Sequence, residues 1–188
     1  LLTLGFKYPE TPNRASREAL FKDQLKDLIL LCWNQNPNPS EFKSCLNQTG
    51  SYAGAIGLPQ FMPGSILRFG VDGNHDGKID LRNSPEDAIA SVANFLKNNG
   101  WIKDQPIYLP INDSPEAINA ATHLADGEAR AKLKLGDLVS TKIIESSELD
   151  YDTPSLIVDL PSPNNQGGID TKYVIGLSNF IVICEYNR

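Results

Sequence analysis

The chain has 188 residues, which is enough for one domain with a small satellite and for a sizeable core. Hydrophobic residues make up 40% and charged residues 21%, a balance that excludes wholesale disorder. The net charge of −6 argues against nucleic acid as a partner, because proteins that neutralise many phosphates carry a basic surplus. The longest purely apolar run, residues 28–33, is far too short to span a bilayer, so we expect no transmembrane segment.

The chain begins at Leu1 without a visible signal sequence, so we expect a processed or trimmed portion of a longer protein. Its three cysteines, Cys32, Cys45 and Cys184, lack C-x-x-C spacing, which argues against a zinc site. In an oxidising compartment Cys32 and Cys45 are able to close a loop, and the alternative is three buried thiols.

Apolar spacing and capping residues predict helices through the first two thirds of the chain. The expected helices run from about Arg14 to Asn34, from a cap at Ser40 to about Leu46, from Pro63 to Phe69, and from a cap at Ser84 to Asn99-Gly100. For the last of these, the apolar face is expected to comprise Ala88, Ile89, Val92, Ala93, Phe95 and Leu96.

The final third is less regular. Strands are expected at 105–111 and 155–160, helices near 114–124 and 135–140, and a loop at 161–168. Residues 179–186 fit a strand or a buried helix equally well, because periodicity alone does not separate the two. The sequence therefore predicts an α+β fold that is mainly α, with a small β-containing insertion.

Residues 50–64 contain four glycines and two prolines among small and aromatic residues. Such a stretch predicts a tightly wound loop in which the backbone approaches a ligand closely. The Gly-Lys-Ser/Thr ending of a phosphate-binding loop is absent, so the glycines do not indicate nucleotide binding.

Residues 72–81 carry the sharpest local signal. Oxygen-bearing side chains alternate there as in EF-hand calcium loops, Gly77 permits the sharp turn, and Lys78 stands where such loops use a backbone carbonyl. The expected ligands of a structural Ca²⁺ are Asp72, Asn74, Asp76, Lys78 through its carbonyl, Asp80 and Asp87. The alternative is an Asx-rich turn that holds no cation.

Asp87 is included because the usual last ligand of the loop is missing. Asn83 stands where an EF-hand has a bidentate glutamate. The exit helix begins late, at Ser84-Pro85, so Asp87 lies in its first turn, where it is placed to close the coordination shell. A plain capping carboxylate is the alternative interpretation of Asp87.

Residues 51–101 contain motifs whose order and spacing are specific. They are SYAGAIGLPQFMP at 51–63, the segment 72–81 (hereafter the acidic loop), DAIASVANF at 87–95 and Gly100-Trp101. These motifs closely resemble the membrane-bound lytic transglycosylase B family, bacterial enzymes that cleave peptidoglycan. Weaker similarity occurs at Phe6-Lys7-Tyr8-Pro9, Tyr173, Gly176-Leu177, Asn179-Phe180 and Tyr186-Asn187.

The resemblance implies a lysozyme-like helical catalytic domain with an EF-hand-like calcium loop and a smaller inserted domain. The expected boundaries are 1–104, with the calcium loop at 72–87, then 105–172 for the insertion and 173–188 for the return. The implied reaction cleaves the MurNAc–GlcNAc β-1,4 bond without water. One glutamic acid protonates the leaving oxygen and then, as a base, helps the muramoyl 6-hydroxyl close a 1,6-anhydro ring.

The resemblance also assigns substrate-binding residues. Ser51 matches a serine beside the catalytic acid, Gln60 matches a glutamine that hydrogen-bonds the glycan, and Tyr186 and Asn187 match a pair near the reacting sugar. Phe95 stands where some relatives carry a tyrosine, which leaves it a stacking role. The alternatives are a turn cap for Ser51, a surface amide for Gln60 and a core position for Phe95.

One departure from the family concerns the catalytic glutamate. In the family it precedes the Phe-x-Tyr-Pro stretch by some two dozen residues, and here Tyr8 is too near the start for that segment to exist. Glu10, Glu18 and Glu41 lie in polar contexts where a solvated carboxylate is expected. We therefore expect the general acid upstream of Leu1, and little activity from residues 1–188 alone.

These patterns predict part of a periplasmic lytic transglycosylase that acts on peptidoglycan glycan strands, with other cell-wall enzymes as further partners. In its full-length form the protein is expected to be soluble or an outer-membrane lipoprotein. The first alternative is a non-catalytic, calcium-stabilised peptidoglycan-binding module. The second is a calcium-dependent structural protein with no role in glycan binding.

Overall fold

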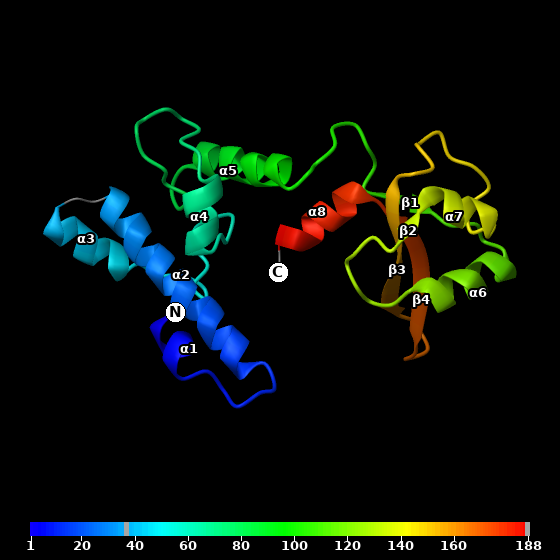
Figure 1. Cartoon of the computed structure of the whole chain (residues 1–188), viewed down its shortest axis with the longest axis horizontal. Coiled ribbons are helices and arrows are strands. Elements are labelled where there is room, and N and C mark those ends of the chain that lie inside the picture. Colours follow the sequence, from blue (N-terminus) through cyan, green and yellow to red (C-terminus); the bar gives the residue numbers. More distant parts are fainter. Residues whose placement is uncertain (36–37, 187–188) are drawn as a thin grey trace. The chain divides into compact units, whose positions relative to one another are not determined.

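The computed structural model describes residues 1–35 and 38–186 (Figure 1). The chain divides into two compact units, Leu1–Phe95 and Leu96–Arg188, and each is described by itself. Helices dominate, and four strands form one small antiparallel sheet. The predicted α+β class, mainly α, is confirmed.

The first unit is helical. Its helices are α1 (Leu2–Phe6), α2 (Arg14–Gln35), α3 (Pro39–Leu46), α4 (Pro63–Phe69) and α5 (Pro85–Asn98), the last of which continues past the division of the chain. The helices predicted from Arg14, Pro63 and Pro85 are confirmed. The predicted cap of α3 is wrong: the cap is Asn38, whose Oδ1 accepts a hydrogen bond from the Ser40 amide at 3.0 Å.

Helix α2 organises the first unit by contacting α1, α3 and α4. A disulfide between Cys32 and Cys45 joins α2 to α3, so the pairing that the sequence left open is present. The side chain of Gln24, 8% exposed, accepts a hydrogen bond from the Gly64 amide at 3.0 Å and ties the start of α4 to α2.

Helix α5 buries only part of the predicted apolar face. Ala88 and Phe95 are buried as expected, whereas Ile89, also expected in the core, is 70% exposed. The buried residues of α5 are Asp87, Ala88, Ser91 and Phe95. Two of these four are polar because α5 packs against an irregular segment whose backbone amides need acceptors.

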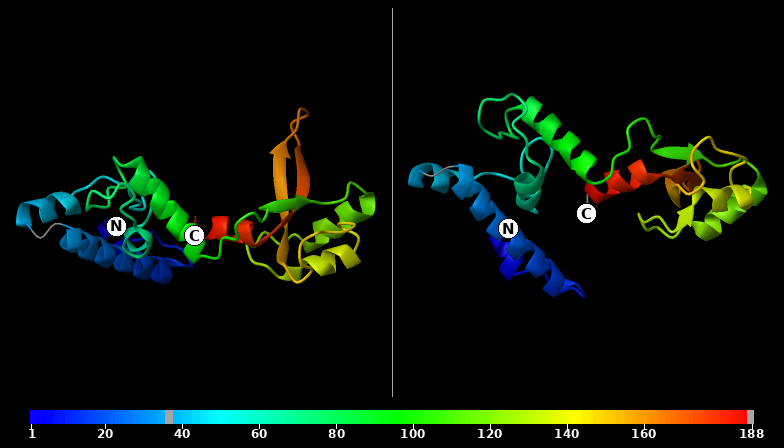
Figure 2. Two further views of the ribbon diagram at one scale, coloured as in Figure 1. Left: turned by 90° about the horizontal axis from the view of Figure 1, so that it is seen from above. Right: turned by 45° about the horizontal axis from the view of Figure 1, so that its top comes forward.

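The second unit holds the sheet. Its elements are β1 (Tyr108–Pro110), α6 (Pro115–Leu124), β2 (Leu133–Lys134), α7 (Leu135–Ser140), β3 (Pro154–Pro163), β4 (Ile169–Gly176) and α8 (Ser178–Tyr186). The strand order is β1-β4-β3-β2. Figure 2 shows the β3–β4 hairpin extending beyond the other strands. The predicted loop therefore begins too early, because Pro161–Pro163 still pair with β4.

The core of the second unit lies between the sheet and helices α6 and α7. It comprises Ala121, Leu135, Leu138, Ile143, Ile157, Ile175 and Leu177. The segment left open between strand and helix is helical, as α8. The fully buried Asn179 anchors α8, since its side chain accepts from the Ile102 amide at 2.8 Å and donates to the Ile102 and Gln105 carbonyls.

The predicted domain boundaries, with residues 173–188 returning to the first domain, stay a prediction. Over residues 1–35 and 38–186, no helix is both long and apolar enough to cross a membrane.

Candidate functional site

A pocket of about 420 Å³ opens on the first unit. It is lined by Thr49, Gly50, Ser51, Gly57, Leu58, Gln60 and Arg82. Two stretches of the α3–α4 connection, residues 49–51 and 57–60, thus meet Arg82, which follows the acidic loop. The pocket brings together two of the predicted binding residues, Ser51 and Gln60.

Ser51 closes a five-residue turn at the edge of this pocket. Its amide donates to the Ala55 carbonyl at 2.9 Å, and its Oγ accepts from the Ala55 amide at 3.0 Å. The turn-cap interpretation of Ser51 is therefore confirmed. A hydroxyl that accepts one hydrogen bond still carries its own hydrogen to donate, so a contact from Ser51 to a ligand stays a prediction.

Gln60 is exposed and has the positive backbone φ of 53° that side chains other than glycine rarely adopt. Its Nε2 donates to the Gly57 carbonyl at 2.8 Å, which fixes the direction of the amide. The Gln60 side chain also carries an acceptor, Oε1, and a second N–H donor, and both groups are suited to hydrogen-bonding a ligand in the pocket. Hydrogen bonding of a glycan by Gln60 stays a prediction that this geometry favours.

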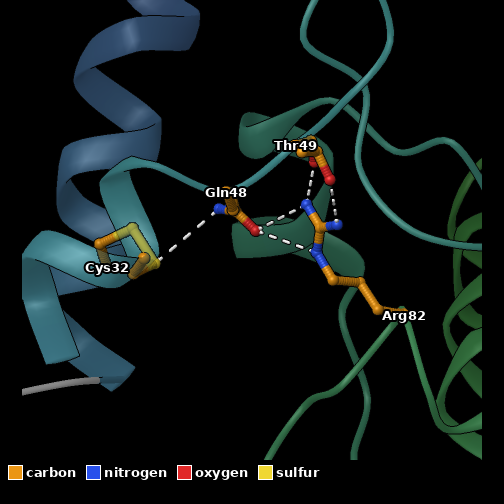
Figure 3. Close-up of a disulfide and its surroundings, with 5 residues drawn as sticks. Cys32, Gln48, Thr49 and Arg82 are labelled. Carbon is orange, nitrogen blue, oxygen red and sulfur yellow. Dashed lines mark hydrogen bonds between the residues drawn. A yellow bond between two sulfur atoms is a disulfide. The ribbon is translucent and has the colours of Figure 1, made fainter.

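Arg82 forms one end of the pocket, and its guanidinium binds the neighbouring segment (Figure 3). Its Nε and Nη2 donate to Gln48 Oε1 at 3.3 and 3.1 Å. Its Nη1 donates to Thr49 Oγ1 at 3.2 Å, and Nη2 also donates to the Thr49 carbonyl. Gln48 in turn donates to Cys45 Sγ of the disulfide at 3.8 Å.

Phe95 and Tyr186 are not among the residues that line this pocket. Phe95 is 7% exposed, and its ring packs against Phe61 and Phe69 at centroid distances of 5.9 and 5.0 Å, so it does fill a core position. Its stacking on a sugar stays a prediction. Tyr186 belongs to the second unit, at the end of α8, and burial raises the pKa of its phenol. The prediction for Asn187 lies outside the described residues.

The acidic loop folds around its own backbone amides. Asp72 accepts from the Asp76 and Gly77 amides at 3.1 and 2.8 Å, and Asn74 also accepts from the Asp76 amide. Asp76 accepts from the Lys78 amide at 2.9 Å. These side-chain oxygens are thus gathered over the loop, and oxygen donors are the ligands that calcium prefers.

Asp87 is the anion that holds this loop to α5. It is fully buried, and its carboxylate accepts hydrogen bonds from the amides of Asp80, Gly73 and Asn74 at 2.7, 2.9 and 3.3 Å. The Asp80 amide is the largest cause that lowers the Asp87 pKa, against the opposing effect of burial. Its own amide donates to Ser84 Oγ, as predicted for the helix start.

The cation ligand set itself is only partly supported. The donor chemistry of Asp72, Asn74 and Asp76 fits calcium. Within residues 1–35 and 38–186, however, no three His, Cys, Asp or Glu side chains are clustered as a metal site. Asp87 already uses both carboxylate oxygens on backbone amides, a geometry that favours an anchoring role for it. Calcium binding by the loop stays a prediction.

Three contributors to this arrangement escaped the sequence analysis. Ser91 Oγ accepts from the Val71 amide at 2.9 Å, Asn94 Nδ2 donates to the Phe69 carbonyl at 3.1 Å, and Arg82 binds Thr49. Asp87, Ser91 and Asn94 recur at helical spacing, so a polar stripe on α5 was the signal available for two of them. Nothing local marks Arg82.

Two of the glutamates considered in the sequence, Glu10 and Glu18, form ion pairs with Arg14. Glu18 pairs with Arg14 at 3.0 Å, and this hydrogen bond is the first cause that lowers the Glu18 pKa. Glu10 also pairs with Arg14. An ionised carboxylate is a poor proton donor, which agrees with the view that Glu18 is not a general acid.

The whole chain matches known transglycosylases. The model of the transglycosylase SLT domain family matches residues 1–188. The chain belongs to the SLT-domain transglycosylase family. It is 32% identical over all of its 188 residues to the membrane-bound lytic murein transglycosylase B of Escherichia coli.

Solved structures of transglycosylases agree with the assignment to the SLT-domain family. The soluble lytic transglycosylase SltB1 from Pseudomonas aeruginosa, in its catenated form, matches 100% of the chain with a TM-score of 0.75 and 32% identity. The E. coli lytic transglycosylase Slt35 in complex with calcium matches 99% of it, with a TM-score of 0.70 and 29% identity. The chain spans about half of each relative: 45% of the curated protein, and 55% and 52% of the two solved chains.

Proposed function

We propose that this SLT-domain chain binds the glycan strand of peptidoglycan for cleavage of the MurNAc–GlcNAc β-1,4 bond, with formation of 1,6-anhydro-MurNAc. The observation that carries the proposal is the pocket in which Ser51 and Gln60 meet. Its hydroxyl and amide groups suit the hydroxyls of a sugar. Leu58, 60% exposed at the same pocket, offers an apolar surface to a sugar face.

The reaction needs a proton donor in addition to these binding groups. In the proposed scheme a glutamic acid ahead of Leu1 gives its proton to the leaving oxygen as the C1–O bond breaks. The muramoyl 6-hydroxyl then bonds to C1, and its proton passes to the glutamate, which restores the acid. Ser51 holds the carboxyl group or the sugar, and Gln60 fixes the glycan against the glycine-rich turn.

We place the protein in the periplasm. The Cys32–Cys45 disulfide supports this proposal, because disulfides persist in oxidising compartments such as the periplasm. We also propose that the full-length protein is anchored by a lipid, which mass spectrometry tests. Its association with other cell-wall enzymes is tested by co-purification.

The function is tested by incubating peptidoglycan with the chain and with a version extended upstream to its natural start. Mass spectrometry of the products reads 1,6-anhydromuropeptides. We expect release by the extended protein and a rate lower by about 10²–10⁴-fold or more for residues 1–188, because removal of a general acid costs that much. Sedimentation of both proteins with the wall without any release would instead favour the non-catalytic binding module.

Gln60 is the binding residue best suited to substitution. Gln60→Gly removes the amide while it tolerates the positive φ of 53°, so the turn is retained. We expect the variant to bind a (GlcNAc–MurNAc)₂ tetrasaccharide about tenfold more weakly, the equivalent of one or two lost hydrogen bonds. Isothermal titration measures the affinity, and unchanged affinity contradicts the role assigned to Gln60.

We further propose that the 72–80 loop binds a structural Ca²⁺, as the related Slt35 was solved in complex with calcium. Asp72, Asn74, Asp76, Asp80 and the Lys78 carbonyl would hold the ion. Its charge would offset the mutual repulsion of the carboxylates, so the ion stabilises the loop rather than taking part in the reaction.

Calcium is expected to raise thermal stability. At a free concentration ten times its Kd, a ligand that binds only the folded state adds about 1.4 kcal/mol, or about 3–6 °C in Tm. Calorimetry with calcium and with a chelator measures the shift. Asp76→Asn is expected to abolish it, whereas Asp104→Asn, outside the loop, retains it. Equal Tm values with calcium and chelator contradict the proposal.

A further inference from the structure

Residues Leu81 and Arg82 sit between the acidic loop and the pocket. They directly follow Asp80, the last acidic residue of the loop, and each contacts a different wall of the pocket. One wall is the segment 49–51 and the other is the segment 57–60.

Arg82 holds the first wall. Its guanidinium donates to Thr49 Oγ1, to the Thr49 carbonyl and to Gln48 Oε1 (Figure 3). Charge-assisted bonds from a planar guanidinium restrict direction as well as distance. The Arg82 side chain therefore fixes Gln48 and Thr49, which lead into Ser51, relative to the residues that follow the acidic loop.

Leu81 holds the second wall through its backbone. Its carbonyl accepts from the Leu58 amide at 2.7 Å. The approach requires glycine at position 57, because a Cβ on Gly57 would lie 2.3 Å from the Leu81 carbonyl oxygen. Because this contact involves backbone atoms alone, we expect the second wall to keep its place when the Arg82 side chain changes.

The position of Arg82 depends on the acidic loop. Asp80 accepts hydrogen bonds from the amides of Arg82 and Asn83 at 3.0 and 3.1 Å, and Asp87 accepts from the Asp80 amide. Through the hydrogen bond from the Arg82 amide, Asp80 thus orients the start of the Arg82 backbone.

We propose that Arg82 is a positioning residue for glycan binding, which holds the Thr49–Ser51 wall at the spacing from Gln60 that the glycan needs. The inference rests on the proposed function of the pocket. Arg82 acts mainly through the wall, because the bonds to Gln48 and Thr49 already use four of its five N–H donors. A direct contact to substrate is not needed for its effect.

The test compares substitutions in the whole chain by titration with (GlcNAc–MurNAc)₂. We expect Arg82→Gln to weaken binding about tenfold and Arg82→Lys about threefold, because lysine keeps the charge but loses the fork. Gln48→Met removes an acceptor of Arg82 from outside the pocket lining. We expect it to weaken binding about threefold and to add little to Arg82→Gln, since both act on one contact. Arg17→Gln, on the exposed surface of α2, is the matched control.

Hydrogen exchange separates positioning from a general loss of stability. The first wall is reported by the Gly54 and Ala55 amides, bonded to Ser51, and the second by the Leu58 and Phe61 amides. In Arg82→Gln we expect faster exchange at the first pair alone. Equal acceleration at all four amides overturns the proposal, because it indicates a purely structural role.

The outcomes distinguish this proposal from the proposed function. If the unchanged chain binds the tetrasaccharide and Arg82→Gln binds as tightly as Arg17→Gln, the positioning role is wrong and the pocket assignment stands. If the unchanged chain does not bind the tetrasaccharide, or if Gln60→Gly binds it as tightly as the unchanged chain, the assignment of the pocket fails. The role of Arg82 then fails with it.

Discussion

Loss of the Cys32–Cys45 disulfide is expected to lower the free energy of unfolding by about 3 kcal/mol, or the Tm by about 6–12 °C. The two cysteines lie 13 residues apart, and the cross-link restricts the unfolded chain more than the folded one. Thermal denaturation of a Cys32→Ala/Cys45→Ala variant measures the effect.

Reductant supplies the control for this experiment. It is expected to lower the Tm of the unchanged chain and of Cys184→Ala, because the disulfide that it breaks is present in both. The double variant is expected not to respond. A reductant effect that persists in the double variant would show that the destabilisation has another source.

Replacement of Asp87 is expected to have the largest effect on stability. In Asp87→Ala three amides, those of Gly73, Asn74 and Asp80, lose their acceptor together. We expect a fall in Tm of roughly 10 °C or more, as for other losses of a buried hydrogen-bond network. The matched control is Glu86→Gln, an exposed acid in the same first turn of α5, for which we expect a small change.

The same carboxylate makes stability depend on acid pH. Folding lowers the Asp87 pKa below its ordinary value of 3.8, so its contribution is fully present above that value and is lost as the pH falls through the lowered pKa. We expect Asp87→Asn to flatten the acid limb of a plot of Tm against pH. Asp80, whose pKa is also lowered, keeps part of the dependence. An acid limb identical to that of the unchanged chain contradicts the assignment.

Local signals were sufficient for most helices of the first unit. Ser84, Pro85 and Asp87 predicted the start of α5, and Pro63 predicted that of α4, because caps and proline act within a single turn. They failed at α3, where Asn38 and Ser40 are both competent caps and the choice depends on the path of the chain. The transglycosylase family was likewise predictable from the motifs in residues 51–101, because their order and spacing can be seen directly in the sequence.

Pairing across the chain was beyond local signals. Ile169–Gly176 forms β4 because it aligns with β3, and Pro161–Pro163 are strand for the same reason. Residues 179–186 are helical, and the anchor of this helix, Asn179, bonds to Ile102 and Gln105, which lie 77 and 74 positions earlier in the chain. Strand pairing and burial depend on partners that periodicity does not identify.

The family, most helices of the first unit and the composition of the acidic loop were predictable, because each is encoded in neighbouring residues. Three contacts became visible only in the folded chain: Cys32 pairs with Cys45, Asp87 anchors the loop backbone, and Arg82 binds the segment leading to Ser51. These contacts join residues 7 to 33 positions apart. They form because folding brings particular donors and acceptors within hydrogen-bonding reach, which no pattern along the chain specifies.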